Sequence, residues 1–157
     1  MKILAIDQAT KTGYAHNCFK KINSGVADFK PRRGDSPGMR FINFKAWLSE
    51  LVKSTKPELI IYEQEHHRGG APTAIALGLI AMISVVATEN NCDITSAHTG
   101  KVKKWATGNG RASKEEMVAA AKKLGFKPED DNEADALLIL LWYLDQFKPI
   151  KITRRKK

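Results

Sequence analysis

The chain has 157 residues, 43% of them hydrophobic and 27% charged, which is typical of one folded domain and excludes a disordered or collagen-like chain. Cys18 and Cys92 form neither a CxxC motif nor a disulfide framework, which favours a reduced, cytoplasmic setting. The opening MKILAID is strand-like and unlike a signal peptide. Polar residues interrupt the longest apolar stretches, so we expect no membrane span.

The net charge of +9 is unevenly distributed along the chain. The last ten residues, KPIKITRRKK, hold six basic and no acidic residues, so residues 1–147 carry 20 basic and 17 acidic residues, a net charge of +3. We therefore predict a folded domain over 1–147 and a basic C-terminal tail over 148–157. The tail is either an arm that binds phosphates or a solvated segment that aids solubility.

The N-terminal half predicts an antiparallel meander, then a helix and a buried strand. The expected strands are Met1–Asp7, Thr12–Ala15 and Lys21–Phe29. A loop rich in turn residues and bases, Lys30–Gly38, leads to a helix over Met39–Lys53 and a strand over Leu59–Glu63.

The C-terminal half alternates helices with one strand, so the whole is an α/β domain with a mixed sheet. After the Gly-rich loop His66–Pro72 comes a nearly all-apolar helix, Thr73–Glu89, that must be covered on most sides. The remaining expected elements are strand Cys92–Ala97, basic helix Thr99–Trp105, a helix opened by a capping box at Ser113 and ending at Leu124, the acidic helix start Glu129–Glu133, and final helix Ala134–Phe147.

Three acids occupy costly positions. Asp7 and Glu63 each end an apolar strand, and Asp135 lies inside an apolar run. If the two strands are neighbours, their carboxyl ends bring Asp7 and Glu63 together. Converging carboxylates favour Mg²⁺, and two such ions suit phosphodiester cleavage. The alternatives are a salt-bridged Asp7, an edge-strand Glu63 and an Asp135 that satisfies a helix dipole.

Three segments in order, MKILAIDQATKTGYA, LIIYEQ and DNEADALLIL, resemble the RuvC-type Holliday junction resolvases. The resemblance covers about residues 1–147, and the compact length resembles a bacteriophage version. It implies an α/β, RNase H-like three-layer fold with a mixed five-stranded sheet flanked by helices. It also implies a homodimeric, Mg²⁺-dependent endonuclease, with Mn²⁺ able to substitute and two ions per active site.

The resemblance assigns roles to individual residues. Asp7, Glu63 and Asp135 match the metal-binding catalytic carboxylates. Lys103 in KVKKW, with its neighbour Lys104, and Lys114 in GRASKEEM match basic residues near the DNA backbone, with Lys114 also catalytic. A lysine there binds phosphate or stabilises transition-state charge; the alternative for each is an ordinary solvated surface lysine.

The sequence departs from the family pattern at several positions. Gln8-Ala9 replace the usual Pro-Gly, and Asn132 occupies the place of the fourth acidic ligand, so Asp131 or Asn132 serves instead. Asp131 lies on the same helix face as Asp135, while Glu133 points away. Glu65 shares a strand face with Glu63 and is an alternative or added ligand.

Two further features concern DNA and the dimer. The family's aromatic wedge is here His66, which with His67 and Arg68 forms a loop expected to contact DNA. The apolar surface of Thr73–Glu89 resembles the dimer helix, and its alternative is simple core packing.

The sequence therefore predicts a dimeric, structure-selective endonuclease that nicks four-way or branched DNA symmetrically in the cytoplasm, or in the host cytoplasm if the origin is a phage. The alternative is a non-catalytic basic DNA-binding module on the same scaffold. Retained acids argue against that module, because unneutralised carboxylates repel DNA. Actin-like sugar kinases share the opening motif but need a second domain that 157 residues cannot supply.

Overall fold

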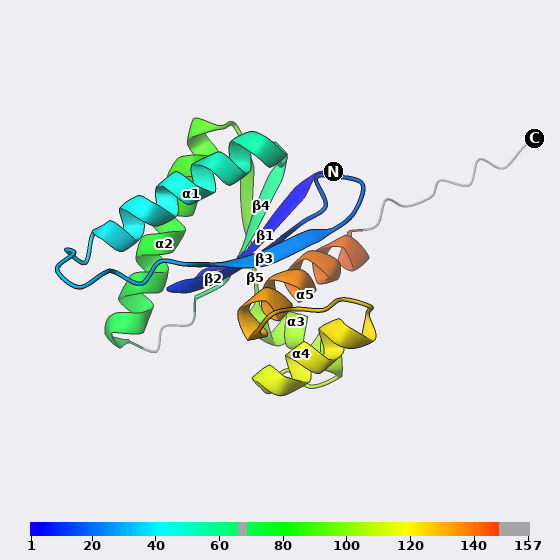
Figure 1. Ribbon diagram of the computed structural model, residues 1–157. Coiled ribbons are helices and arrows are strands. Elements are labelled where there is room, and N and C mark those ends of the chain that lie inside the picture. Colours follow the sequence, from blue (N-terminus) through cyan, green and yellow to red (C-terminus); the bar gives the residue numbers. More distant parts are fainter. Residues whose placement is uncertain (66–68, 148–157) are drawn as a thin grey trace, which may run out of the picture.

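Five strands form one mixed sheet in the spatial order β3-β2-β1-β4-β5 (Figure 1). The computed structural model describes residues 1–65 and 69–147. The strands are β1 (Ile3–Asp7), β2 (Lys11–His16), β3 (Asn23–Asp28), β4 (Leu59–Glu63) and β5 (Asp93–Ala97). The first three pair antiparallel, whereas β4 and β5 run parallel to β1. The predicted meander and mixed sheet are confirmed.

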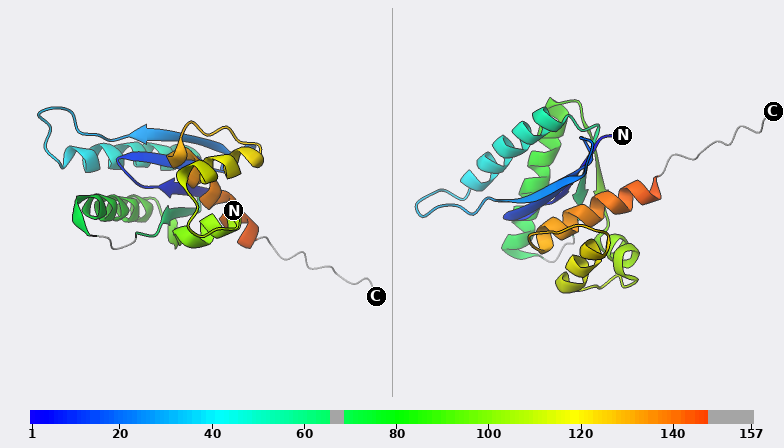
Figure 2. Two further views of the ribbon diagram at one scale, coloured as in Figure 1. Left: turned by 90° about the horizontal axis from the view of Figure 1, so that it is seen from below. Right: turned by 45° about the vertical axis from the view of Figure 1, so that its right-hand side comes forward.

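Helices cover both faces of the sheet and make three layers (Figure 2). One face carries α1 (Met39–Thr55) and α2 (Gly70–Glu89). The other carries α3 (Thr99–Thr107), α4 (Lys114–Lys123) and α5 (Asp131–Gln146), with α5 packed directly on β1 and β2 and α4 packed on α5. This arrangement confirms the expected RNase H-like architecture.

The alternation of side chains along β1 builds a separate core on each face. Leu4 and Ile6 pack toward α1 and α2, whereas Ile3 and Ala5 pack toward α5. The same alternation in β4 directs Leu59 and Ile61 toward α5. Asp7 and Glu63 continue these series, so both strands end with an acid on the α5 side.

Helix boundaries differ from the predicted ones in several places, and α1 ends at Thr55 rather than Lys53. α2 begins at Gly70 and includes Pro72, because a proline in the first helical turn removes no intrahelical hydrogen bond. α3 continues to Thr107, where Gly108 with φ of 80° ends it. The acidic segment and the final helix form one helix, α5, capped by Asp130. The predicted capping box at Ser113 is confirmed.

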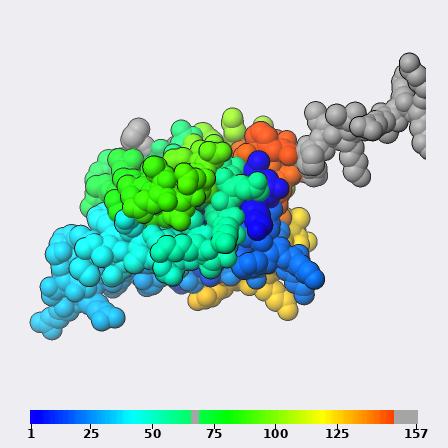
Figure 3. Space-filling view, turned by 90° about the horizontal axis from the view of Figure 1, so that it is seen from above, coloured from blue at the N-terminus to red at the C-terminus, as the bar shows by residue number. Residues whose placement is uncertain are grey.

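α2 is less covered than its composition predicts. Its buried side chains, among them Leu79, Ile83 and Val86, lie on the face toward the sheet, while Leu77 and Val85 are 44% and 39% exposed. Figure 3 shows α2 in green along the outer surface beside α1 in cyan. Contrary to expectation, α2 is long and apolar enough to cross a membrane, alone among the helices of the described residues. Its buried face packs in the core with β1 and β4.

Candidate active site

Asp7 and Glu63 meet at the carboxyl ends of the two central strands. Because β1 and β4 are parallel neighbours, the strand ends place both acids at one edge of the sheet. Asp7 is only 6% exposed, and its carboxyl group hydrogen-bonds the Glu63 carboxylate. A buried acid next to another acid is stable only if a proton or a cation lies between them.

Gly13 allows α5 to approach this edge. Gly13 is the cross-strand partner of Asp7 in β2, and a Cβ atom built on it would lie 1.9 Å from the backbone oxygen of Asn132. Only glycine therefore admits the first turn of α5 at this distance. Asp135, three residues along α5 from Asn132, comes within electrostatic reach of Asp7 and Glu63. Gly13, in the segment MKILAIDQATKTGYA, thus helps to position the third acid.

Burial and mutual repulsion hold protons on this cluster. Burial, together with the charge and hydrogen bond of Glu63, raises the pKa of Asp7 well above its usual range. Burial and the charge of Glu63 raise the pKa of Asp135 to about 7, although Lys103 and Lys114 oppose that shift. A cation that neutralises the three carboxylates would displace these protons.

Two lysines expected near the scissile phosphate lie beside the carboxylates. The Lys114 ammonium lies 2.8 Å from Asp131 Oδ2, and this contact raises the pKa of Lys114. Lys103 acts on Asp135 through its charge from α3. Lys104 instead lines a pocket on another side of α3, together with Trp105. The structure therefore brings Lys103 and Lys114, but not Lys104, to the cluster.

Two uncharged side chains, Gln8 and Thr99, hold Glu63 by hydrogen bonds that the sequence did not predict. Gln8 is 5% exposed; its Nε2 donates to the Glu63 backbone oxygen at 2.6 Å, and its Oε1 accepts from the Glu63 N–H at 3.0 Å. Thr99, at the start of α3, donates its hydroxyl to Glu63 Oε1 at 2.5 Å. The only signal for the first contact was the unusual glutamine directly after Asp7.

The three candidates for a further metal ligand, Asp131, Asn132 and Glu65, lie in different places. Asp131 lies close enough for its charge to raise the pKa of both Asp7 and Asp135, as its predicted helix face requires. Asn132 and Glu65 line a neighbouring pocket of 460 Å³ that also contains Gln8. The expectation that Glu65 shares a strand face with Glu63 is wrong, because β4 ends at Glu63.

Glu133 points away from the cluster, as predicted, and has a structural role. It is 7% exposed, accepts a hydrogen bond from Ser24 of β3 at 2.6 Å, and accepts another from the Glu129 N–H at 2.6 Å. It therefore ties the start of α5 to the sheet. The predicted DNA-contacting loop residues His66, His67 and Arg68, and the tail 148–157, lie outside the described residues.

The carboxylates of Asp7, Glu63 and Asp135 suit a hard divalent cation, although they do not yet converge on one point. Within residues 1–65 and 69–147, no three acidic, histidine or cysteine side chains converge closely enough to hold a metal ion as they stand. Asp135 Oδ1, however, is buried with no hydrogen-bond partner, and Asp7 pairs with no lysine or arginine of the described chain. Mg²⁺ keeps several waters and needs few direct carboxylate ligands, so these residues suit it.

A sheet of this strand order, with acids at the ends of β1 and β4 and a third acid on α5, is the arrangement expected of an RNase H-like fold. A scan against models of protein families finds no match. The chain is 30% identical over 152 residues to the crossover junction endodeoxyribonuclease RuvC of Desulforamulus reducens, covering 90% of this chain and 91% of that protein. It therefore belongs to the RuvC family of crossover junction endodeoxyribonucleases.

Two other similarities agree with this family. The RuvC protein of Caldanaerobacter subterraneus subsp. tengcongensis is 27% identical over 151 residues, 90% of each chain. The fold of Thermus thermophilus RuvC in complex with Holliday junction substrate matches with a TM-score of 0.71, 21% identity, and coverage of 90% of this chain and 91% of that one. The expected family and fold are thus confirmed.

Proposed function

We propose that this protein is a metal-dependent endonuclease that resolves four-way DNA junctions. The observation that carries the proposal is the buried Asp7 paired with the half-buried Glu63 and close to Asp135, whose Oδ1 is buried with no hydrogen-bond partner among the described residues. Relatives named as crossover junction endodeoxyribonucleases, and a structural neighbour in complex with a Holliday junction, support the substrate.

Asp7, Glu63 and Asp135 would hold Mg²⁺ or Mn²⁺, two ions in our proposal, with Asp131 as the nearest further carboxylate and Asn132 and Glu65 as the remaining alternatives. Bound metal ions supply Lewis acidity, neutralising charge on the phosphate and lowering the pKa of the attacking water. Lys103 and Lys114 provide positive charge beside the carboxylates, where a phosphate would bind and charge would develop during cleavage. Gln8 and Thr99 hold Glu63 in place.

The exposed apolar side of α2 supports a homodimer. Leu77 and Val85 are exposed on an apolar helix that packs on the sheet core and on α1, and Figure 3 shows α2 at the outer surface beside α1. A second copy would remove this surface from water. Two-fold symmetry would present two sites to opposite strands of a junction and explain symmetric nicks.

The remaining predictions follow from charge and family. We propose that residues 1–147 form the nuclease domain, and that Lys104, His66, His67, Arg68 and the basic tail 148–157 add phosphate contacts. We also propose a cytoplasmic location and a phage origin, the second resting only on the compact length. DNA recombination and repair would then be the processes served.

The direct experiment is a divalent-metal titration with a labelled immobile four-way junction and a matched linear duplex. We expect paired nicks in opposite junction strands with Mg²⁺ or Mn²⁺, no nicks with EDTA, and little cleavage of the duplex. Tight junction binding without nicking in any metal would instead support the non-catalytic DNA-binding module.

A further inference from the structure

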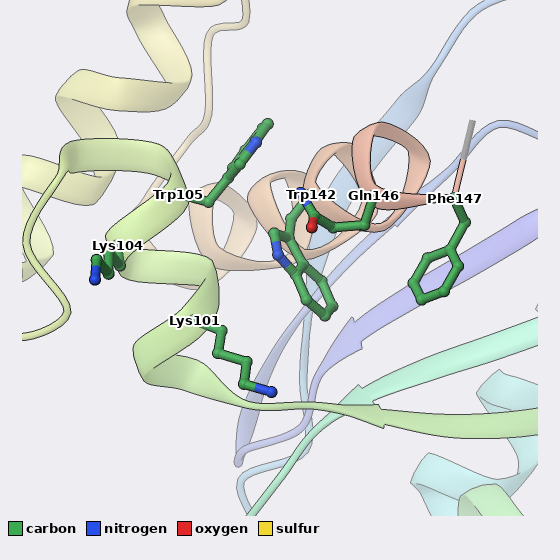
Figure 4. Close-up of a pocket in the computed structure, with 6 residues that line it drawn as sticks. All are labelled: Lys101, Lys104, Trp105, Trp142, Gln146 and Phe147. Carbon is green, nitrogen blue, oxygen red and sulfur yellow. The ribbon is translucent and has the colours of Figure 1, made fainter. Parts of the chain in front are cut away.

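A pocket of 520 Å³ lies between α3 and the C-terminal end of α5, on another side of α3 from the carboxylates (Figure 4). Its walls are two helix faces. Lys101, Lys104 and Trp105 lie at positions i, i+3 and i+4 of α3, and Trp142 and Gln146 lie at i and i+4 of α5, with Phe147 directly after that helix. The volume is in the range of about 300–1,000 Å³ that small-ligand sites occupy.

Contacts with neighbouring residues of α5 hold the aromatic side chains of the pocket in place. The Trp105 indole N–H donates to Asp145 Oδ2 at 2.9 Å, which fixes this ring against α5. Phe147 is 61% exposed and packs on Tyr143 with ring centroids 4.4 Å apart. Trp142 is only partly buried and contacts the core cluster from its edge. Large aromatic surfaces that stay accessible on rigid helices are suited to stacking on a flat ligand.

The charge of the same surface selects an anionic ligand. Lys101 and Lys104 are exposed at the rim, and Figure 4 shows Lys101 extended toward the side where Trp142 lies. Among the residues that the structure describes, none of the six that line the pocket is acidic. Positive charge next to aromatic faces is the combination by which proteins bind single-stranded nucleic acid, since lysines neutralise phosphates and the rings stack on bases.

The pocket is placed to meet a strand that passes the carboxylates. Trp142 follows Asp135 by seven residues on α5, a rise of about 10 Å. That distance equals about three nucleotides at 3.4 Å each along a duplex strand. α3 connects the two places, because Lys103 acts on Asp135 while Lys101 and Lys104 border the pocket.

We propose that this pocket binds an unpaired nucleotide of the DNA strand a few positions from the cleaved bond, with the base stacked on Trp142 and the phosphate at Lys101. This inference rests on the proposed function, since it names a second contact for the same DNA. It makes the surface between α3 and the C-terminal end of α5 a site for branch-point nucleotides that have lost their stacking partners.

The test measures binding of the full-length protein to single-stranded oligothymidylate and to an immobile four-way junction, without metal. Stacking should quench tryptophan fluorescence, and most of the quenching should be missing in Trp142→Phe. Trp142→Ala should weaken oligothymidylate binding about 10-fold, as expected for the loss of one stacked base, while Trp142→Phe retains most of the affinity.

Lys101→Ala should lower the slope of log K against log salt by about 0.7 on single strands. Lys53→Ala, an exposed lysine of α1 far from the pocket, is the matched control and should leave the slope unchanged. Circular dichroism checks the fold of each variant, and Trp142→Phe keeps the test decisive if Trp142→Ala does not fold.

Three results would overturn the inference. One is equal quenching and affinity in Trp142→Phe, Trp142→Ala and the wild type. Another is an altered sedimentation coefficient in Trp142→Ala without any DNA-dependent quenching, which would make the pocket a contact between copies. The third is a Trp142 emission that changes on removal of residues 148–157 but not on DNA binding, which would make the tail the occupant. If the wild-type protein binds junctions but never nicks them, the proposed function is refuted. The quenching result would still show whether DNA stacks on Trp142.

Discussion

Asp7 is a residue whose charge costs folding free energy, and the proposed metal offsets that cost. Its carboxyl group is buried against Glu63, and burial with this neighbouring charge raises the pKa of Asp7. Without a cation the folded protein must either protonate Asp7 or bear an unfavourable buried charge. Stability without metal and catalysis with metal therefore make opposite demands on this position.

We predict that Asp7→Asn abolishes cleavage and increases the stability of the metal-free protein at pH 8. The amide keeps a hydrogen bond toward Glu63 and removes the buried charge, so the free energy of unfolding should rise. Thermal unfolding and junction-cleavage assays measure the two effects, with exposed Asp28→Asn as the control. Lower stability in Asp7→Asn would show that Asp7 is a structural acid.

Gln8 is a positioning residue, because its amide pairs with both backbone polar groups of Glu63. We predict that Gln8→Met, of similar length but without these hydrogen bonds, destabilises the protein by about 1–3 kcal/mol. Half-maximal cleavage should then need about 10-fold more Mg²⁺ as Glu63 loses its fixed position. The control is Gln64→Met, because Gln64 is an exposed glutamine that directly follows Glu63 in the chain. An unchanged Mg²⁺ dependence in Gln8→Met would contradict this role.

At the scale of elements, the site depends on how closely α5 lies to β2. Gly13 leaves no room for a side chain, because its Cβ would meet the Asn132 backbone oxygen. We predict that Gly13→Ala displaces the start of α5 and lowers the cleavage rate at least about 100-fold, since a shift of 1 Å can have that effect. Gly38→Ala is the control, as a Cβ there meets only Ser36 Oγ at an ordinary 3.6 Å. Cleavage at the wild-type rate in Gly13→Ala would argue against this placement of Asp135.

The sequence predicted the elements well because each one carries local signals. Apolar runs that end in acids marked β1 and β4, and the capping box marked α4, within a residue or two of the observed bounds. Strand alternation alone explains why Asp7 and Glu63 face α5.

The parts of the site that the sequence did not predict depend on tertiary contacts. The partner of Gln8 lies 55 residues away, and the Gly13 contact and the Glu133–Ser24 hydrogen bond, which fix the start of α5 on the sheet, also join distant segments. Glu65 was misplaced because nothing local indicates that β4 ends two residues before it. Sequence patterns report the local structure of a segment and do not indicate which distant residues come into contact.

At the scale of the whole molecule, the carboxylate cluster links stability to pH and metal. Asp135 has its pKa raised from 3.8 to about 7 on folding, so the unfolded chain releases its proton first as pH rises. Between these values the unfolded state binds fewer protons than the folded state, and the stability of the metal-free protein falls. The loss from this group, about three pKa units, is on the order of 4 kcal/mol and is complete only above pH 7.

We therefore predict that Mg²⁺ raises the melting temperature more at pH 8 than at pH 5. At pH 5 protons already neutralise the cluster and must be displaced, whereas at pH 8 the ion relieves an uncompensated charge. Calorimetric unfolding with and without Mg²⁺ at both pH values measures the difference, and Asp135→Asn should reduce it. A metal effect of equal size at both pH values would argue that Mg²⁺ binds elsewhere.

The central claim is that strand β4 supplies a metal-binding carboxylate at Glu63, joined to Asp7 across the sheet. Single-turnover cleavage of an immobile four-way junction in Mg²⁺ tests it most directly when Glu63→Gln is compared with Glu65→Gln. We predict at least about a 100-fold loss for Glu63→Gln, since an amide is a poor replacement for a carboxylate ligand, and a rate within a few-fold of wild type for Glu65→Gln. The reverse ranking, or cleavage by Glu63→Gln at the wild-type rate, would contradict the account.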